Sequence, residues 1–204
     1  MLTIHHLRIG RSIFTVWLLE ELGIDYALKE YRRDTNMRAG DDLKVIHPLG
    51  KSPVIEDEGL VLSESGAITS YLLEKFDKDM TFSPPRTKLK DWARYTQWLH
   101  YSEGSVFAPL LIKILLQRDK EPSPLLSAFS QAEITLHLNH LSNQLANNEF
   151  ILGNKISGAD FGISYAIFTA QQLGLLKSHP TLNAYIDRNK TRPAFQAAIA
   201  RAVE

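Results

Sequence analysis

Short runs that alternate between apolar and polar residues fill the first third of the chain and predict β-strands. Residues 2–7 and 26–31 alternate weakly, as half-buried strands do. Two further apolar runs, residues 54–55 and 60–62, flank the acidic stretch 56–59, which indicates a hairpin. The sequence therefore predicts a small sheet near the N-terminus.

Helices are predicted between and after these strands. Ser12 is a suitable N-cap for a helix that Gly23 ends, and residues 63–66 open a second helical run. The polar segment 32–42 is interpreted as irregular or as a short helix. The order strand, helix, strand, loop, hairpin, helix, over about eighty residues, suits a sheet covered by helices.

From residue 88 onwards the apolar positions recur at helical spacing. Gly104 and Pro109 interrupt the first of these runs, so it is predicted to be kinked or split into two helices. Ser157 and Asp160 have the spacing of a capping box, and the helix that follows is apolar on nearly all sides. We expect that helix to lie buried at the centre of its domain.

The change of pattern predicts two domains. Residues 1–79 form an α/β domain, residues 80–87 with their adjacent prolines form a linker, and residues 88–204 form an all-α domain. No internal repeat is visible.

Charge and composition exclude several classes of function. Lys plus Arg and Asp plus Glu both number 23, so the net charge of zero argues against nucleic acid or an anionic membrane surface as the main partner. No apolar run approaches the roughly 20 residues of a membrane span, and the first residues lack a signal peptide's pattern. A soluble, cytoplasmic protein is expected.

The absence of cysteine is the most informative entry in the composition. It excludes disulfides, thiolate nucleophiles and Cys metal sites, so any sulfur chemistry must use a thiol brought in by a ligand. His137 and His140 share a helical face, but no third ligand accompanies them, so a solvated pair is favoured over a metal site. His5 and His6 alternate faces of a strand and cannot readily serve one site.

Residues 50–66 carry two features that can bind a peptide-like anion. Pro53 enters a strand, where a cis bond would turn the preceding backbone groups outward, although cis is the minority form for X-Pro bonds. Glu64 and Ser65 stand at a helix N-terminus, which offers free N–H groups, a carboxylate and a hydroxyl.

Several motifs, in order, make the chain resemble a cytosolic glutathione S-transferase from near residue 2 to near residue 198. The motifs that carry the resemblance are Val16–Gly23, His47–Val54, Ser63–Ile68, Ser157–Phe161, His179–Leu182 and Arg192–Phe195. Residues 98–104 look more like fungal and bacterial members. The resemblance implies a thioredoxin-like N-terminal domain, an all-helical C-terminal domain and a homodimer. Glutathione serves as co-substrate without a further cofactor, and the partner substrate is a small hydrophobic electrophile.

The resemblance also implies a glutathione site. Ser52, before a cis Pro53 and Val54, would pair through its backbone with the cysteinyl part of glutathione. Glu64 and Ser65 match the pair that holds its γ-glutamyl end.

Lys51 matches a residue near the glycyl carboxylate of glutathione, and His47 is expected near the same end. An anionic ligand agrees with the positive potential of Lys51 and of a helix N-terminus.

Activation of the thiol is assigned to the loop after the first strand. A thiol with a pKa near 8.5 is mostly protonated at neutral pH, so the site must stabilise the thiolate. Similar proteins show Ser-Arg-Ser in this loop; here Gly10 occupies the first serine, and Phe14 replaces a common arginine. We expect Ser12 to donate to the thiolate, with Arg11 or the loop's backbone N–H groups as alternatives.

The sequence is compatible with three functions, which it favours unequally. The first is conjugation of glutathione to electrophiles, with reduction of organic peroxides as an additional activity; Tyr95 and Ser102 are assigned to the electrophile pocket. A thiol–disulfide oxidoreductase is disfavoured because it requires a protein cysteine. A non-catalytic ligand carrier of the same fold is kept open by Gly10.

Overall fold

The computed structural model describes residues 1–202, which belong to two compact units. The first unit comprises residues 1–81 together with the chain from Lys190 onwards, and the second comprises Phe82–Asn189. This division differs from the predicted domain boundaries, because the last helix belongs to the N-terminal sheet unit. Phe82, within the predicted linker, is buried and accepts a hydrogen bond from the Gly158 N–H at 2.7 Å.

The first unit contains a four-stranded sheet in the order β2-β1-β3-β4. The strands are β1 (Thr3–Leu7), β2 (Ala27–Tyr31), β3 (Val54–Asp57) and β4 (Leu60–Ser63). β1 runs parallel to β2 and antiparallel to β3, and β3 and β4 form the predicted hairpin. The hairpin turn is shorter than the acidic stretch suggested, because only Glu58 and Gly59 leave the strands, both with positive φ (51° and 86°).

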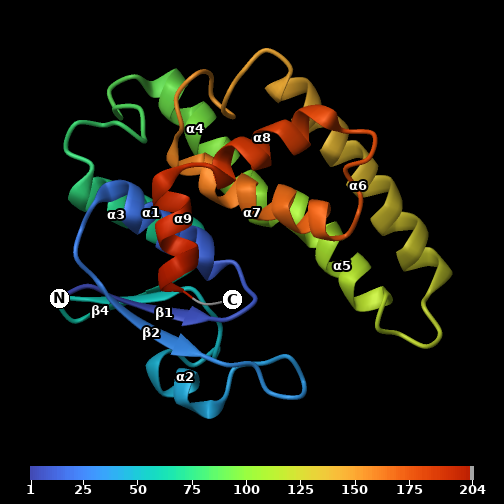
Figure 1. Ribbon diagram of the computed structural model, residues 1–204, viewed down its shortest axis with the longest axis horizontal. Helices are drawn as coiled ribbons and strands as arrows, with labels where there is room; N and C mark the ends of the chain where they lie inside the picture. Colours follow the sequence, from blue (N-terminus) through green and yellow to red (C-terminus); the bar gives the residue numbers. More distant parts are fainter. Residues whose placement is uncertain (203–204) are drawn as a thin grey trace. The chain divides into compact units, whose positions relative to one another are not determined.

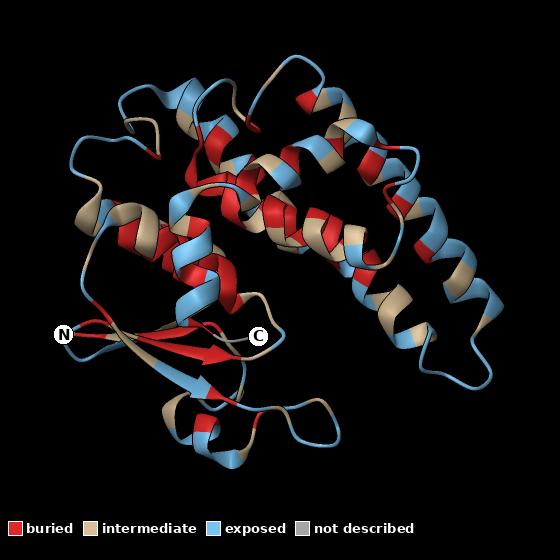
Figure 2. Cartoon of the chain, in the orientation of Figure 1, coloured by how far each residue is buried: buried red, intermediate tan, exposed pale blue. Residues whose placement is uncertain are grey.

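Helices cover both faces of this sheet (Figure 1). They are α1 (Ser12–Leu22), α2 (Asp41–Ile46), α3 (Ser65–Phe76) and α9 (Pro193–Arg201). The α2 side is closed by a cluster of Leu7, Tyr31, Ala39 and Leu43, with Ile46 packed against it. On the other side α1 is buried over most of its length, since it contacts β1, α3 and α9 (Figure 2).

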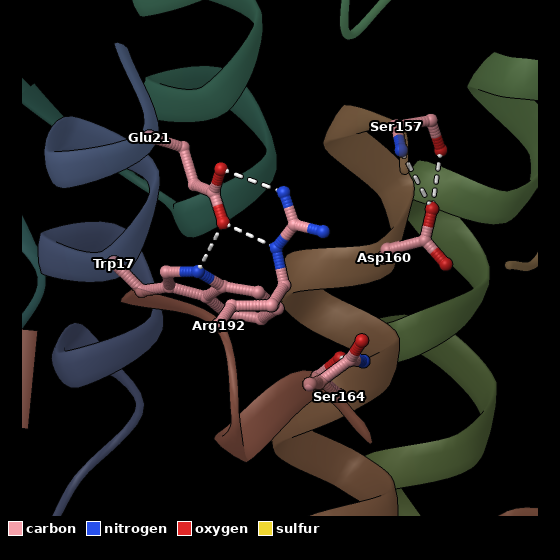
Figure 3. A network of polar contacts seen from close by, with 7 residues as sticks. Trp17, Glu21, Ser157, Asp160, Ser164 and Arg192 are labelled. Atoms are coloured by element: carbon pink, nitrogen blue, oxygen red, sulfur yellow. Dashed lines mark hydrogen bonds and ion pairs between the residues drawn. The ribbon is translucent and has the colours of Figure 1, made fainter. Parts of the chain in front are cut away.

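α9 is joined to α1 by aromatic and ionic contacts. Phe195 meets Phe14 and Trp17 edge-on, with ring centroids 5.9 and 5.3 Å away. The Arg192 guanidinium forms two bonds to the Glu21 carboxylate, at 2.5 and 2.9 Å, and the same carboxylate accepts from the Trp17 indole at 2.8 Å (Figure 3). These contacts explain why the C-terminal helix belongs to the first unit.

The second unit is helical throughout its described elements. They are α4 (Leu89–Tyr101), η1 (Ser102–Phe107), α5 (Ala108–Leu116), α6 (Pro124–Leu145), α7 (Gly158–Gln172) and α8 (Pro180–Lys190). The interruption predicted near Gly104 and Pro109 is a π-helical turn, η1, between α4 and α5. Within residues 1–202, no helix combines the length and apolar character needed to cross a bilayer.

α7 is the buried helix that the sequence predicts, and its capping box is confirmed. The Asp160 carboxylate accepts from the Ser157 N–H and hydroxyl, both at 2.8 Å (Figure 3). It also accepts from the Ile151 N–H at 2.9 Å and the Tyr185 hydroxyl at 2.8 Å. Burial nevertheless raises the pKa of this carboxyl, which is fully enclosed in the unit.

Candidate active site

The sheet register brings three separate backbone segments of the first unit together. Val54 pairs with His5 of β1 on one side and with Ser63 of β4 on the other. The Ser52–Pro53 segment that precedes Val54 therefore lies between the end of β1 and the start of α3. This arrangement gathers residues that are tens of positions apart in the chain.

The Ser52–Pro53 bond is cis, as the resemblance implies. The Ser52 hydroxyl donates to the His5 carbonyl at 2.7 Å and accepts from the Leu7 N–H at 3.1 Å. Pro53 and Val54 are buried. Because the Ser52 side chain is tied to β1, its backbone is the part that can pair with a ligand.

Glu64 and Ser65 form the start of α3. Glu64 is exposed and adopts φ 70° and ψ 115°, a region that residues other than glycine rarely occupy, and such a conformation often marks a functional position. Ser65 is the first helical residue, and the first acceptor of the helix is the Glu64 carbonyl, bonded to the Ile68 N–H at 2.9 Å. The N–H groups of the first turn thus favour an anion.

Lys51 and His47 lie on the segment that leads into the cis bond. Lys51 is exposed directly before Ser52, and His47 follows the end of α2. The Nδ1 atom of His47 is buried and has no hydrogen-bond partner within residues 1–202. Gly50 between them has φ +55°, and a Cβ there would come within 2.7 Å of the Lys44 side chain.

Ser12 lies elsewhere than expected. It is the first residue of α1 and fully buried, and Arg11 takes the N-cap position without a side-chain capping bond. The Ser12 hydroxyl is 2.9 Å from His6 Nδ1 and donates to the Leu7 carbonyl at 3.4 Å. The expectation that Ser12 caps the helix is therefore wrong, because Arg11 takes that position. Its role as donor to a bound thiol stays a prediction, for a hydroxyl that is enclosed and already hydrogen-bonded.

Arg33 is a residue that the sequence argument missed. It is half-buried after β2, and its guanidinium donates to the carbonyls of Arg8, Ile9 and Met37 at 2.9, 2.8 and 2.8 Å. It thereby ties down the loop after β1. No spacing or motif in the sequence marks it, because the contact joins residues 24 and 25 positions apart.

Tyr95 and Ser102 do not form an open pocket wall. Both side chains are buried, with exposed fractions of 1% and 3%. Ser102 donates to the Leu99 carbonyl at 3.2 Å and packs against Gly162 of α7. Their assignment to the electrophile pocket stays a prediction, made for two side chains that are enclosed in the second unit.

The two histidines of β1 lie on opposite faces of the sheet, as predicted. His5 contacts the Tyr31 hydroxyl and the Glu56 carboxylate, both at 2.8 Å, on the face opposite His6.

The predicted solvation of the His137 and His140 pair holds for His140, which is exposed, whereas His137 is half-buried. His137 Nδ1 lies 2.6 Å from the Tyr101 hydroxyl, and His140 stacks on Trp98. Within residues 1–202, no group of three or more potential metal ligands occurs.

Comparison with known proteins identifies the family. Residues 2–74 match the glutathione S-transferase N-terminal domain and residues 108–201 match the C-terminal domain. The chain is 30% identical to glutathione S-transferase 3 of Schizosaccharomyces pombe, over 97% of the chain and 86% of that protein. The chain belongs to the glutathione S-transferase family. It is an enzyme of this family, with a thioredoxin-like N-terminal domain and a helical C-terminal domain.

Other relatives agree with this assignment. Glutathione S-transferase 1 of Saccharomyces cerevisiae is 28% identical over 99% of the chain and 95% of its own length. A crystal structure of a glutathione S-transferase from Actinobacillus pleuropneumoniae superposes with a TM-score of 0.91 at 32% identity, covering 99% of the chain and 93% of that protein. The fold and the fungal and bacterial resemblance are thereby confirmed.

Proposed function

We propose that this transferase conjugates the thiolate of glutathione to small hydrophobic electrophiles and also reduces organic peroxides. The proposal is supported by two neighbouring features of the first unit. They are the cis Ser52–Pro53 bond and the start of α3, where Glu64 has a positive φ. A sphingomonad glutathione S-transferase of the same fold, 23% identical with a TM-score of 0.79 over 98% of both chains, was solved with glutathione bound.

In this proposal, the tripeptide is held along the segment described above. The backbone of Ser52 pairs with the cysteinyl part of glutathione, beside Pro53 and Val54. Glu64 and Ser65 bind the γ-glutamyl end, where the carboxylate of Glu64 attracts the ammonium group and the α3 N-terminus attracts the carboxylate.

Lys51 and His47 bind the glycyl end of glutathione in this proposal. An exposed ammonium group and a ring nitrogen without a hydrogen-bond partner among residues 1–202 suit a carboxylate.

Thiolate stabilisation falls to the loop that ends at Ser12. Because the Ser12 hydroxyl is enclosed, Arg11 and the backbone N–H groups of the loop are the better donors. Backbone donors held in place can stabilise a developing anion as well as a hydroxyl does.

We further propose a cytoplasmic homodimer. The dimer follows from the family resemblance, and the location follows from the composition of the chain. The presence of a mass twice that of the 23.1 kDa chain in light scattering would support the dimer.

The proposed function is tested by glutathione calorimetry together with initial rates on an aryl chloride and an organic peroxide. Glu64→Ala is expected to weaken glutathione binding at least tenfold, since it removes a charge-assisted contact worth about 1.5–3 kcal/mol. Glu121→Ala, an exposed carboxylate in the second unit, is the matched control and should bind as the unmodified chain does. Binding without turnover would leave only a ligand carrier, and no binding would contradict the proposal altogether.

A further inference from the structure

The peptide group between Ile9 and Gly10 is held by Arg33. One guanidinium nitrogen, Nη2, donates to the Ile9 carbonyl at 2.8 Å, and Nε donates to the Arg8 carbonyl at 2.9 Å. In a trans peptide group the C=O and the following N–H point in opposite directions, and among residues 1–202 the only cis bond is Ser52–Pro53. The Gly10 N–H therefore points away from Arg33.

This N–H is available to a ligand. Within residues 1–202, the Gly10 carbonyl accepts from the Ile13 N–H, but no acceptor is found for the Gly10 N–H itself. The loop runs beside the proposed cysteinyl position, because Leu7 at its start is bonded to the Ser52 hydroxyl. Gly10 also stands where related sequences place a serine.

Gly10 and Arg33 are sterically coupled. A Cβ added at Gly10 would lie 3.0 Å from Arg33 Nη2 and 3.0 Å from the Leu7 carbonyl oxygen. A side chain at this position would therefore push the guanidinium away from the Ile9 carbonyl. The guanidinium can occupy its place beside the Ile9 carbonyl because residue 10 has no side chain.

We propose that Arg33 is a positioning residue for the glutathione thiolate: it fixes the Ile9–Gly10 peptide group so that the Gly10 N–H donates to the sulfur. Ionisation releases the thiol proton to water, and the fixed donor stabilises the remaining anion without reorganisation. The guanidinium adds a permanent positive charge behind the peptide group, because arginine does not lose its proton in this range of pH. This inference rests on the proposed function and assigns a residue to its thiol activation.

Two histidines near the loop are kept neutral by burial. The charged and titratable groups on the elements around it include His5, His6, Arg8, Arg11, Lys29, Glu30, Tyr31, Arg32, Asp34, His47 and Lys51. Burial lowers the pKa values of His5 and His6, the latter to about 4, and Arg8 is paired with Glu30 at 2.6 Å. A titration that is followed by the thiolate absorbance, is seen only with glutathione bound and moves with residue 33 is therefore assigned to the thiol.

The experiment measures the pKa of bound glutathione from thiolate absorbance, with the pH profile of kcat/KM alongside. Arg33→Gln is expected to raise the pKa of the bound thiol by about one unit and to lower kcat/KM about tenfold at pH 6.5, with convergence at high pH. The glutathione Kd near pH 6 should change less than about threefold, since the donor acts on the thiolate. Arg32→Gln, the exposed neighbouring arginine, is the matched control and should leave the thiol pKa in place.

Two further variants keep the test decisive if Arg33→Gln folds poorly. Arg33→Lys keeps the positive charge but not the pair of hydrogen bonds to the Arg8 and Ile9 carbonyls. We therefore expect a smaller rise of the thiol pKa than in Arg33→Gln. Gly10→Ala should also raise the thiol pKa. The double variant Gly10→Ala, Arg33→Gln should raise the thiol pKa no further than the single variant with the larger effect does. An unchanged thiol pKa in Arg33→Lys and Gly10→Ala, or an equal shift in Arg32→Gln, would overturn the role of Arg33 alone. Failure of the unmodified chain to bind glutathione would overturn the proposed function and this inference together.

Discussion

His6 lies on the buried side of the loop that follows β1. It is fully buried, and its Nδ1 lies 2.9 Å from the Ser12 hydroxyl. Desolvation lowers its pKa from 6.5 to about 4, more than the nearby Glu30 carboxylate raises it. A neutral imidazole is therefore part of the folded state down to mildly acidic pH.

This shift predicts a loss of stability on acidification. Above pH 6.5 the ring is neutral in both states; between pH 6.5 and about 4 the unfolded chain takes up a proton that the folded chain does not. The free energy of unfolding should therefore fall with pH in this window, by about 3 kcal/mol in total from His6. His5, with a lowered pKa of its own, acts in the same direction.

Urea unfolding at pH 7, 6 and 5 measures this effect. His6→Asn can still form a hydrogen bond with the Ser12 hydroxyl but cannot take up a proton, so its free energy of unfolding should depend less steeply on pH. His100→Asn, on an exposed histidine, is the control and should retain the original slope. Equal slopes for both variants would contradict the assignment to His6.

At the scale of elements, the contact between η1 and α7 depends on one glycine. A Cβ on Gly162 would lie 2.5 Å from the Ser102 hydroxyl oxygen and 3.1 Å from its Cβ. Gly162→Ala is therefore expected to lower the free energy of unfolding by about 1–3 kcal/mol, because two buried helices must separate. Thermal or denaturant unfolding measures the change.

Gly104→Ala provides the matched control for that substitution. It lies in η1 with no atom within 4 Å of an added Cβ, so alanine should be neutral or stabilise the chain by about 0.5–1 kcal/mol. If Gly162→Ala proved as stable as Gly104→Ala, the close approach of α7 and η1 would be contradicted.

At the scale of the whole molecule, the sequence predicts the features that depend on residues close together in the chain. Ser52, Pro53, Glu64 and Ser65 stand in short motifs, and the turn and cap residues around them fix their backbone locally. The hydrogen bond from Arg33 to the Ile9 carbonyl was not predictable. Neither periodicity nor local propensity encodes a contact between a side chain and a carbonyl that are far apart in the sequence. The burial of Ser12 was missed for the same reason, since its partner His6 is set by the docking of α1 on β1.

The return of the chain to its first unit was the other feature that the sequence did not reveal. Residues 193–201 have the helical pattern of the segments before them, so they were assigned to the all-α domain. Only packing shows that α9 covers α1, through Phe195 and Arg192. The first unit is thus built from both ends of the chain, and α1 is incompletely covered without the last helix.

Phe195→Ala tests this dependence in the chain of 204 residues. The side chain is buried between Phe14 and Trp17, so its truncation should lower the free energy of unfolding by about 3–5 kcal/mol. Amide hydrogen exchange should accelerate in β1 and α1, although these segments are more than 170 residues away in sequence from Phe195. Phe129→Ala, on a side chain of α6 that is 51% exposed, should change stability by no more than about 0.5 kcal/mol. Faster exchange confined to α7 and α8 would instead assign α9 to the helical unit, and an effect no larger than that of Phe129→Ala would show that the first unit stands without it.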